Sequence, residues 1–274
     1  MPWVRNIWEI SLPVLAERGY MIMAVNSDTT DYVSCAIALS ASIKQFHPSV
    51  NICLVTDAAD AKYTTWFDHI QLLPYGDVST NSSWRLSNDW QAFAASPYRE
   101  TIKLEADMIA AGPIDHWWNL FEKRNVVIST GCRDFYNRTS QSRFYRTLFD
   151  ANDLPDVYNA ITYWRLSTEA KDFFQLVRNI FENWDKYKIL LKFPDDEPTT
   201  DVVYAIAAKI VGPELVTLPK GLGPSIVHMK KHINPIVSND WTKELVWEHT
   251  IPGLRINTVA QSGLVHYHIK DFIK

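Results

Sequence analysis

Two acidic residues, Glu105 and Asp107, stand two positions apart at the end of an expected strand, 101–104. Residues two apart in a strand point to the same side, so both carboxylates would face one way. Paired carboxylates repel each other unless a proton or a cation lies between them. Mg²⁺ and Mn²⁺ prefer oxygen ligands and can bind a diphosphate at the same time. The pattern by itself leaves two interpretations, a divalent-cation site or two solvated acids at a strand end.

Two histidines near the carboxyl end of the chain, His266 and His268, are also two positions apart. In a strand they would share a face, which favours a polar face, although a histidine on an apolar strand is more often a hydrogen-bonded core residue. His228 and His232 have the i, i+4 spacing of a helix but lack the HExxH pattern of zinc proteases. We interpret this second pair as acceptor-side surface and not as a zinc site.

The segment 131–149 is rich in arginines and aromatic rings and holds a single acid, Asp134. It admits two interpretations: an amphipathic helix with its rings in the core, or an acceptor platform whose rings stack on a base or a sugar. Downstream lysines would extend such a platform, and a DNA acceptor with a hydroxylated, flipped-out base would suit it. The net charge of −4 argues against DNA. The residues concerned are Arg133, Arg138, Arg143, Arg146, Phe135, Tyr136, Phe144, Tyr145, Phe149, Lys230 and Lys231.

The elements that must position these groups alternate between strands and helices. Buried strands are expected at 20–26, 51–56, 101–104 and 125–129, and helices at 33–43, after Ser167 and from Thr199 onward. This order predicts an α/β protein with a central, mostly parallel sheet flanked by helices. Ligands of such sheets bind beyond the carboxyl ends of the strands, where Asn26 and Glu105 lie. No glycine-rich phosphate loop follows an expected strand, which excludes a dinucleotide fingerprint and a P-loop.

The composition is that of an ordinary globular protein of 274 residues, with 47% hydrophobic and 21% charged residues. The high aromatic content, 13%, suits both a packed core and the stacking of sugars or bases. Three cysteines without a CxxC pair indicate a reducing compartment and no zinc cluster. The apolar stretch 7–10 is too short for a signal peptide, and no run is long enough to cross a membrane. We therefore expect a cytoplasmic location.

Six segments, in order along nearly the whole chain, resemble family 8 glycosyltransferases, and the likeness is closest to uncharacterised bacteriophage-encoded members. The segment 96–108 is similar to the family's DxD segment and the strand before it, and 114–118 is similar to the helix that follows. The segment 20–31 resembles the first strand and nucleotide loop. The last three matches are 158–161 to the Asn-Ala-Gly segment, 200–201 to the Asp-Gln segment and 265–268 to the strand with the last metal-ligand histidine.

The resemblance implies a single GT-A-like domain over 1–274, with a nucleotide-sugar half at about 20–130 and an acceptor half at about 131–274. It implies retaining transfer of a sugar from a nucleotide-sugar donor, a UDP-sugar by family likeness, with Mn²⁺ or Mg²⁺ as cofactor. By the same likeness the metal ligands are Asp107, Glu105 and His266. The donor-binding residues are Val25, Asn26, Asp28, Arg85 and Glu105. The groups near the reacting centre are Asp201, Asn159 and Lys270, the last as a cation beside the leaving phosphate.

The chain departs from the family pattern at three positions that matter. Glu105 replaces the first aspartate of DxD, Ile161 replaces a glycine, and Val202 replaces the glutamine expected beside the anomeric carbon. We therefore name no nucleophile. The acceptor stays open among a polysaccharide, a protein and a hydroxylated DNA base. Two rival functions also stay open, a metal-dependent nucleotidyltransferase and a sugar or nucleic-acid binder without turnover.

Overall fold

The computed structural model describes residues 13–58, 60–80, 85–219, 221–250 and 253–273. The apolar stretch 7–10, which we judged too short for a signal peptide, lies outside these residues. Among the residues that are described, no helix is long and apolar enough to cross a membrane. All three cysteines are buried, and none of them forms a disulfide with another described residue.

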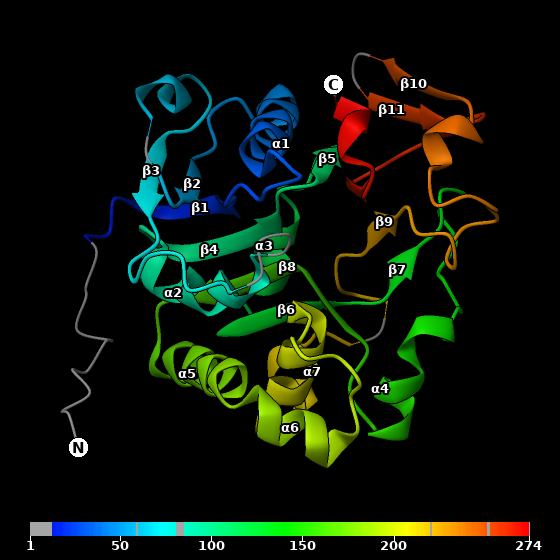
Figure 1. Cartoon of the computed structure of the whole chain (residues 1–274). Coiled ribbons are helices and arrows are strands. Elements are labelled where there is room, and N and C mark those ends of the chain that lie inside the picture. The colour runs from blue at the N-terminus through cyan, green and yellow to red at the C-terminus, as the bar shows by residue number, and fades with distance from the viewer. Residues whose placement is uncertain (1–12, 59, 81–84, 220, 251–252, 274) are drawn as a thin grey trace.

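A mixed sheet forms the centre of the molecule (Figure 1). Within the described residues it has six strands in the order β3-β2-β1-β4-β8-β6. The first four are parallel to one another, and β8 runs antiparallel to both β4 and β6. The expectation of a mostly parallel sheet is thus confirmed. The strands are β1 (Ala16–Met23), β2 (Ile52–Thr56), β3 (His69–Leu72), β4 (Tyr98–Glu105), β6 (Val126–Thr130) and β8 (Val157–Arg165).

Helices cover both faces of this sheet. In Figure 1, α1 lies above the sheet, and α5, α6 and α7 lie below it. Alternate residues of β1 serve the two faces: Tyr20 and Ile22 pack with α1, whereas Met21 belongs to the core shared with α5 and α7. The helices are α1 (Tyr32–Phe46), α2 (Ala92–Ala95), α3 (Trp117–Phe121), α4 (Thr147–Ala151), α5 (Thr168–Glu182), α6 (Trp184–Leu191), α7 (Thr200–Val211) and α8 (Pro213–Val216).

The long helices begin where a short polar side chain satisfies a free backbone N–H group. The Asp31 carboxylate accepts a hydrogen bond from the N–H of Ser34 at 3.0 Å, which starts α1. The Ser167 hydroxyl accepts one from the N–H of Ala170 at 3.1 Å, as the sequence predicted for α5. Each cap pairs one of the N–H groups that a helix start leaves unsatisfied.

Two smaller sheets lie beside the central one. The second sheet has the order β5-β13-β9-β7, and the third sheet is the antiparallel meander β10-β11-β12. β5 begins three residues after the end of β4, so β13 and β9 are brought to the carboxyl end of β4. The strands are β5 (Met108–Ala110), β7 (Cys132–Arg133), β9 (Ile226–His228), β10 (Trp247–Thr250), β11 (Gly253–Ile256), β12 (Val259–Ala260) and β13 (Leu264–His266).

The interpretation of 131–149 as one amphipathic helix is wrong. The segment starts as β7, continues through a turn and becomes helical only at the short 3₁₀ helix 144–146 and α4. The Asp134 carboxylate accepts hydrogen bonds from the N–H groups of Tyr136 and Arg138, at 2.9 and 3.0 Å. Asn137 takes a left-handed backbone with φ 63°. Local side-chain-to-backbone bonds of this kind compete with helix formation.

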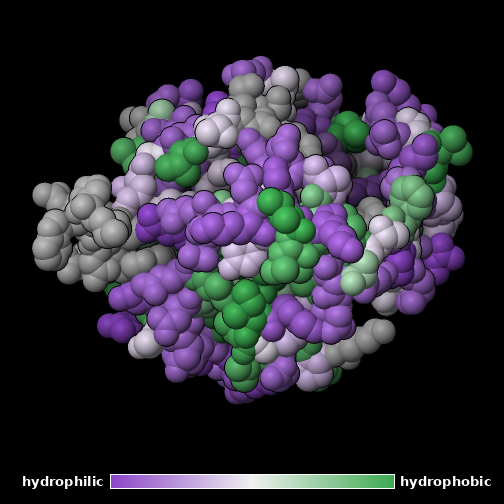
Figure 2. Space-filling view, turned by 60° about the horizontal axis from the view of Figure 1, so that its bottom comes forward, coloured by the Kyte–Doolittle hydropathy of each residue, from purple (hydrophilic) through white to green (hydrophobic). Residues whose placement is uncertain are grey.

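The outer surface over the lower helices is mostly hydrophilic. Figure 2 turns the bottom of Figure 1 toward the viewer and shows a hydrophobic patch near the centre of a largely polar face. On α6, Ile189 and Leu190 are exposed. These apolar side chains lie outside the cavity described below.

Candidate functional site

The carboxyl end of β4 carries the two predicted carboxylates. Glu105 is the last residue of β4, and Asp107 follows after one residue, in the short turn that leads into β5. The backbone carbonyl of Asp107 accepts a hydrogen bond from the N–H of Tyr267 at 3.2 Å. This bond holds the turn against the segment that follows β13. Asp107 is therefore fixed between a strand of the central sheet and a strand of the second sheet.

His266 contacts both carboxylates. Its Nε2 lies 3.0 Å from Oδ2 of Asp107, and its Nδ1 lies 3.4 Å from Oε2 of Glu105. The backbone of β13 places the ring, because His266 is paired with Met108 of β5. One potential ligand atom from each of the three residues lies within 4.8 Å of the others. Ligand atoms on opposite sides of one ion are about 4 Å apart, so this set fits a divalent cation after a small shift.

A lysine neutralises the more buried carboxylate. Lys270, the first residue of a 3₁₀ helix at 270–273, forms an ion pair with Asp107. Burial alone would raise the pKa of Asp107, but the charges of His266 and Lys270 outweigh it and hold this pKa well below its usual value. Burial raises the pKa of Glu105, His266 opposes that rise, and Asp107 adds to it. The two carboxyls therefore differ in acidity, although they share His266.

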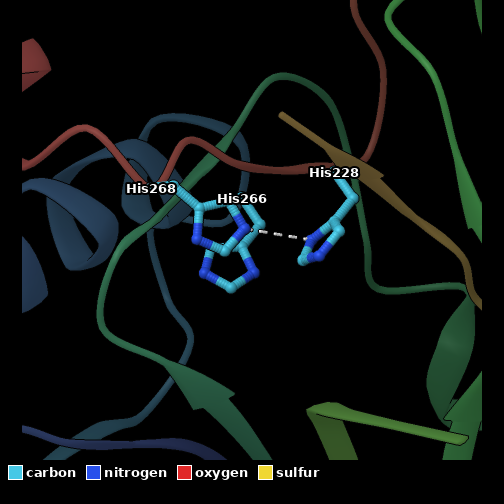
Figure 3. Close-up of side chains that lie close together, drawn as sticks. All are labelled: His228, His266 and His268. Carbon is cyan, nitrogen blue, oxygen red and sulfur yellow. Dashed lines mark hydrogen bonds between the residues drawn. The ribbon is translucent and has the colours of Figure 1, made fainter. Parts of the chain in front are cut away.

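Three histidine rings gather beside the carboxylates (Figure 3). His266 and His268 stack with ring centroids 3.9 Å apart, and His228 lies 4.9 and 4.6 Å from them. Nε2 of His268 is 3.4 Å from Nδ1 of His228. Burial lowers the pKa of His228 and of His268 well below the usual value, and the neighbouring histidines lower both further. Both rings are therefore neutral at pH 7 and have lone pairs available.

The interpretation of His228 as acceptor-side surface is wrong. His228 ends β9, a strand paired with β13 and β7, and it is buried because it lies in the interior of that sheet. The chain leaves the strand after His228, so the helical spacing to His232 has no structural meaning. His232 alone is exposed, where its ring stacks on Phe144 with centroids 4.3 Å apart.

A cavity of about 660 Å³ opens beyond the carboxyl ends of β1 and β4. Its volume is typical of pockets for small molecules and cofactors. The histidine cluster and both carboxylates form one part of its wall, and the start of α7 forms another. Seven of the site residues expected from the sequence line it: Val25, Arg85, Glu105, Asp107, Asp201, His266 and Lys270.

Three other expected site residues do not belong to the cavity wall. Asn26 accepts a hydrogen bond from the N–H of Val33 at 3.0 Å and so helps to begin α1. Asp28 is exposed in the loop between β1 and α1. Asn159 is fully buried, and its N–H donates to Oδ1 of Asp201 at 2.8 Å. The structure therefore places Asn159 as a support for Asp201.

Asp201, the second residue of α7, is held from two sides. Besides the bond from Asn159, its Oδ2 accepts a hydrogen bond from Nη2 of Arg146 at 3.0 Å. The guanidinium of Arg146 lies 4.0 Å from the ring centroid of Tyr158 and 4.3 Å from that of Phe149. A carboxylate is also stabilised at the N-terminus of a helix. The side chain of Asp201 is consequently held in one orientation in the cavity wall.

A second buried ion pair, Lys103 with Asp89, was not singled out from the sequence. Lys103 lies on β4 two residues before Glu105, and both members of the pair line the cavity. Oδ1 of Asp89 also accepts hydrogen bonds from the hydroxyl of Tyr204 at 2.5 Å and from Nδ2 of Asn159 at 3.2 Å. The sequence did hold a signal for this pair, because Lys103 stands within an otherwise apolar strand. A lysine in such a position is rarely buried unless it has a charged partner.

The arginines of 131–149 all bind other groups of this chain, whether they are buried or exposed. Arg133 donates to the backbone carbonyls of Ser225 and Ser262, at 3.3 Å each. Arg138 pairs with Asp134 at 2.7 Å, and Arg143 pairs with Asp150 and, at 2.9 Å, with Asp156. Arg146 is buried and lines the cavity, so its expected role as a contact on the outer surface is wrong.

The expected aromatic wall divides into core and surface. Phe135 is buried in a hydrophobic cluster that includes Val227 and Trp241 and is not part of an acceptor surface, whereas Tyr136 and Phe144 are exposed. Phe149 is buried and lines the cavity from α4. The side chain of Tyr145 lies outside the described part of the structure. Of the two lysines expected nearby, Lys230 lines the cavity and Lys231 is exposed.

Comparison with known proteins identifies the fold of this chain but assigns it to no sequence family. No family model matches the chain, and no curated protein matches it. Among solved structures, the bifunctional glycosyltransferase WbbM aligns with a TM-score of 0.52 and 11% identity, over 94% of this chain and 47% of WbbM. The chain has a glycosyltransferase fold. It is of the GT-A type, and the 11% identity shows the fold alone.

Two further glycosyltransferase structures align less well. An active-site mutant of LgtC gives a TM-score of 0.49 at 11% identity, over 91% of this chain and 87% of LgtC. GlyE of Streptococcus pneumoniae TIGR4 gives 0.45 at 8% identity, over 74% and 45%. The chain thus spans less than half the length of GlyE and WbbM. In this glycosyltransferase fold the cavity lies beyond the carboxyl ends of parallel strands, as α/β sheets predict.

Proposed function

We propose that the protein is a metal-dependent glycosyltransferase that takes its sugar from a UDP-sugar and transfers it with retention of configuration. The observation that carries the proposal is the convergence of Glu105, Asp107 and His266 on one cavity at the end of β4. The glycosyltransferase fold supports it. A diphosphate leaving group is stabilised by nearby positive charge. This part of the cavity combines potential ligands for a cation with the ammonium group of Lys270.

Glu105, Asp107 and His266 would hold Mn²⁺ or Mg²⁺. Their two carboxylates and one imidazole are ligands that divalent cations use in proteins. A bound cation would stabilise the negative charge of the departing diphosphate as a Lewis acid. Lys270 adds a second positive charge beside Asp107. Because Asp107 is ionised well below neutral pH, it is available as a ligand throughout the physiological range.

Asp201 would act on the reacting sugar. During transfer the bond from the anomeric carbon to the diphosphate oxygen breaks, and its electron pair leaves on the diphosphate. The acceptor hydroxyl oxygen forms the new bond, and its proton goes to the released diphosphate. The anomeric carbon gains positive charge in this step, and the fixed carboxylate of Asp201 stabilises that charge without reorganising. Asn159 and Arg146 act through Asp201 as positioning residues.

The two halves of the chain would divide the substrates between them. Residues at about 20–130 supply Val25 and Arg85 to the donor side of the cavity, and we assign Asn26 and Asp28 to the edge of the same side. Residues at about 131–274 supply the acceptor side. The arginines at 133, 138 and 143 are already paired with groups of this chain, so we favour a polysaccharide or protein hydroxyl over a DNA base.

The test is donor turnover by the purified protein. A panel of UDP-sugars is incubated with Mn²⁺, with and without EDTA, and UDP release is measured. The proposal expects release with at least one donor and its loss in EDTA. Metal-independent release, or no binding of any donor, contradicts it. Release of pyrophosphate in place of UDP would instead identify a nucleotidyltransferase.

A further inference from the structure

The histidine cluster is larger than the trio assigned to the cation. His228, His266 and His268 form a second set whose potential ligand atoms lie within 4.8 Å of one another. His266 belongs to both sets, so the two are continuous. His228 and His266 are the last residues of β9 and β13, His268 lies in the turn that follows, and Figure 3 shows the three rings close together.

The ring of His228 is buried without a full set of partners. The residue is 3% exposed, and in the described part of the chain its Nε2 has no hydrogen-bond partner. Its Nδ1 has only the 3.4 Å contact to His268. Buried polar atoms are normally paired, and an exception points to a missing ion or water. Tyr158, whose ring lies edge-on to His228 at 5.6 Å, does not supply that partner.

The backbone at His268 is held in a costly conformation. His268 has φ 59°, and the N–H of Ile269 donates to the carbonyl of Tyr267 at 2.7 Å across it. A three-residue turn with positive φ at its centre is rare and strained. This turn stacks the His268 ring on His266 and aims it toward His228. Backbone strain of this kind is retained mainly at functional sites.

We propose that His228 and His268 complete the ion site of Glu105, Asp107 and His266, and that this imidazole-rich site selects a first-row transition ion over Mg²⁺. Imidazole nitrogen suits the later first-row ions such as Co²⁺, Ni²⁺ and Zn²⁺, whereas Mg²⁺ prefers an all-oxygen shell. The inference rests on the proposed function for the use of the ion in sugar transfer. The binding of the ion itself needs no donor and is tested without one.

The experiment measures Co²⁺ binding to the chelator-treated full chain by visible absorption, with Mg²⁺ as competitor. The key variant is His268→Gly, because glycine suits the positive φ and the fold is retained. His228→Gln is the second variant. His232→Gln is the matched control, since His232 is exposed outside the cluster. Thermal unfolding of each apo-protein checks that the variants are folded.

We expect each of the two cluster variants to weaken Co²⁺ binding about 10- to 100-fold, and the control to leave it unchanged. We also expect a hundredfold excess of Mg²⁺ to leave Co²⁺ bound to the wild-type protein. Unchanged affinity in folded His268→Gly, or ready displacement of Co²⁺ by Mg²⁺, overturns the inference. Selective Co²⁺ binding without UDP release from any donor upholds the inference and removes the proposed function. EDTA-sensitive UDP release, together with unchanged Co²⁺ affinity in both variants, upholds the proposed function and overturns the inference.

Discussion

Nε2 of His266 lies 3.0 Å from the carboxylate of Asp107, although the two residues are far apart in the sequence. The contact exists because β5 continues directly from the Asp107 turn and pairs with β13, which ends at His266. A metal ligand set is thus assembled by a strand pairing in the second sheet. The central sheet contributes the remaining carboxylate, Glu105, at the end of β4.

The first prediction concerns Asp107→Asn. The amide cannot carry the negative charge that Lys270 and a bound cation require, so kcat/KM for UDP release should fall by about 100-fold or more. The overall fold should persist, because the backbone bond from Tyr267 to residue 107 does not involve the side chain. Asp115→Asn, at an exposed position before α3, is the control and should keep full activity. Full activity of Asp107→Asn would show that the assignment is wrong.

The second prediction concerns the buried pair of Lys103 and Asp89. Lys103→Met leaves the charge of Asp89 buried without its cation and should lower the free energy of unfolding by about 3–5 kcal/mol. Adding Asp89→Asn removes that stranded charge, so the double variant should lose less than the sum of the two single losses. Urea denaturation of the four proteins measures the difference. Strict additivity would mean that the two side chains do not interact.

The third prediction concerns the close contact between the backbone of Gly19 in β1 and the ring of Tyr98 in β4. A Cβ atom at Gly19 would overlap the ring of Tyr98 and stand 2.9 Å from the carbonyl oxygen of Asn51. Gly19→Ala should therefore destabilise the protein by about 1–3 kcal/mol. At Gly223 the same change meets only Cβ of Leu218, at 3.7 Å. Thermal unfolding of the two variants should separate them, and equal midpoints would contradict the packing described for β1.

The fourth prediction concerns the cap of α1 and its pH dependence. Burial would raise the pKa of Asp31, but hydrogen bonds from Ser34 outweigh it and lower this pKa. The carboxylate therefore stabilises the folded state above its unfolded pKa of about 3.9, and this contribution is lost as the pH falls through the lower folded value. Asp31→Ala should cost about 1 kcal/mol near pH 7. The gap between variant and wild-type protein in urea unfolding should narrow below about pH 4.

Asp28→Ala is the matched control for that experiment. Asp28 is exposed three residues earlier in the same loop, so its removal should change the unfolding free energy by less than about 0.5 kcal/mol at any pH. A loss as large as that of Asp31→Ala would locate the effect in the net charge of the loop and not in the cap.

The sequence by itself determined the local features of this protein. Alternating apolar strands and amphipathic helices predicted the mostly parallel sheet, because a strand buried on both faces is continuously apolar. The cap at Ser167 follows from one short polar side chain before a periodic segment. The spacing of Glu105 and Asp107 placed two acids at a strand end, since residues i and i+2 share a face of a strand. Each of these rules acts within a few residues.

Only the tertiary structure decided which remote residues meet. The helical spacing of His228 and His232 was misleading, because pairing of β9 with β13 buries His228 beside His266. Arg146 resembled a surface arginine until the start of α7 placed Asp201 against it. A single sequence carries no record of strand pairing across such separations, since the hydrogen bonds and buried charges that decide it join groups far apart along the chain. The histidine cluster is the consequence of that pairing.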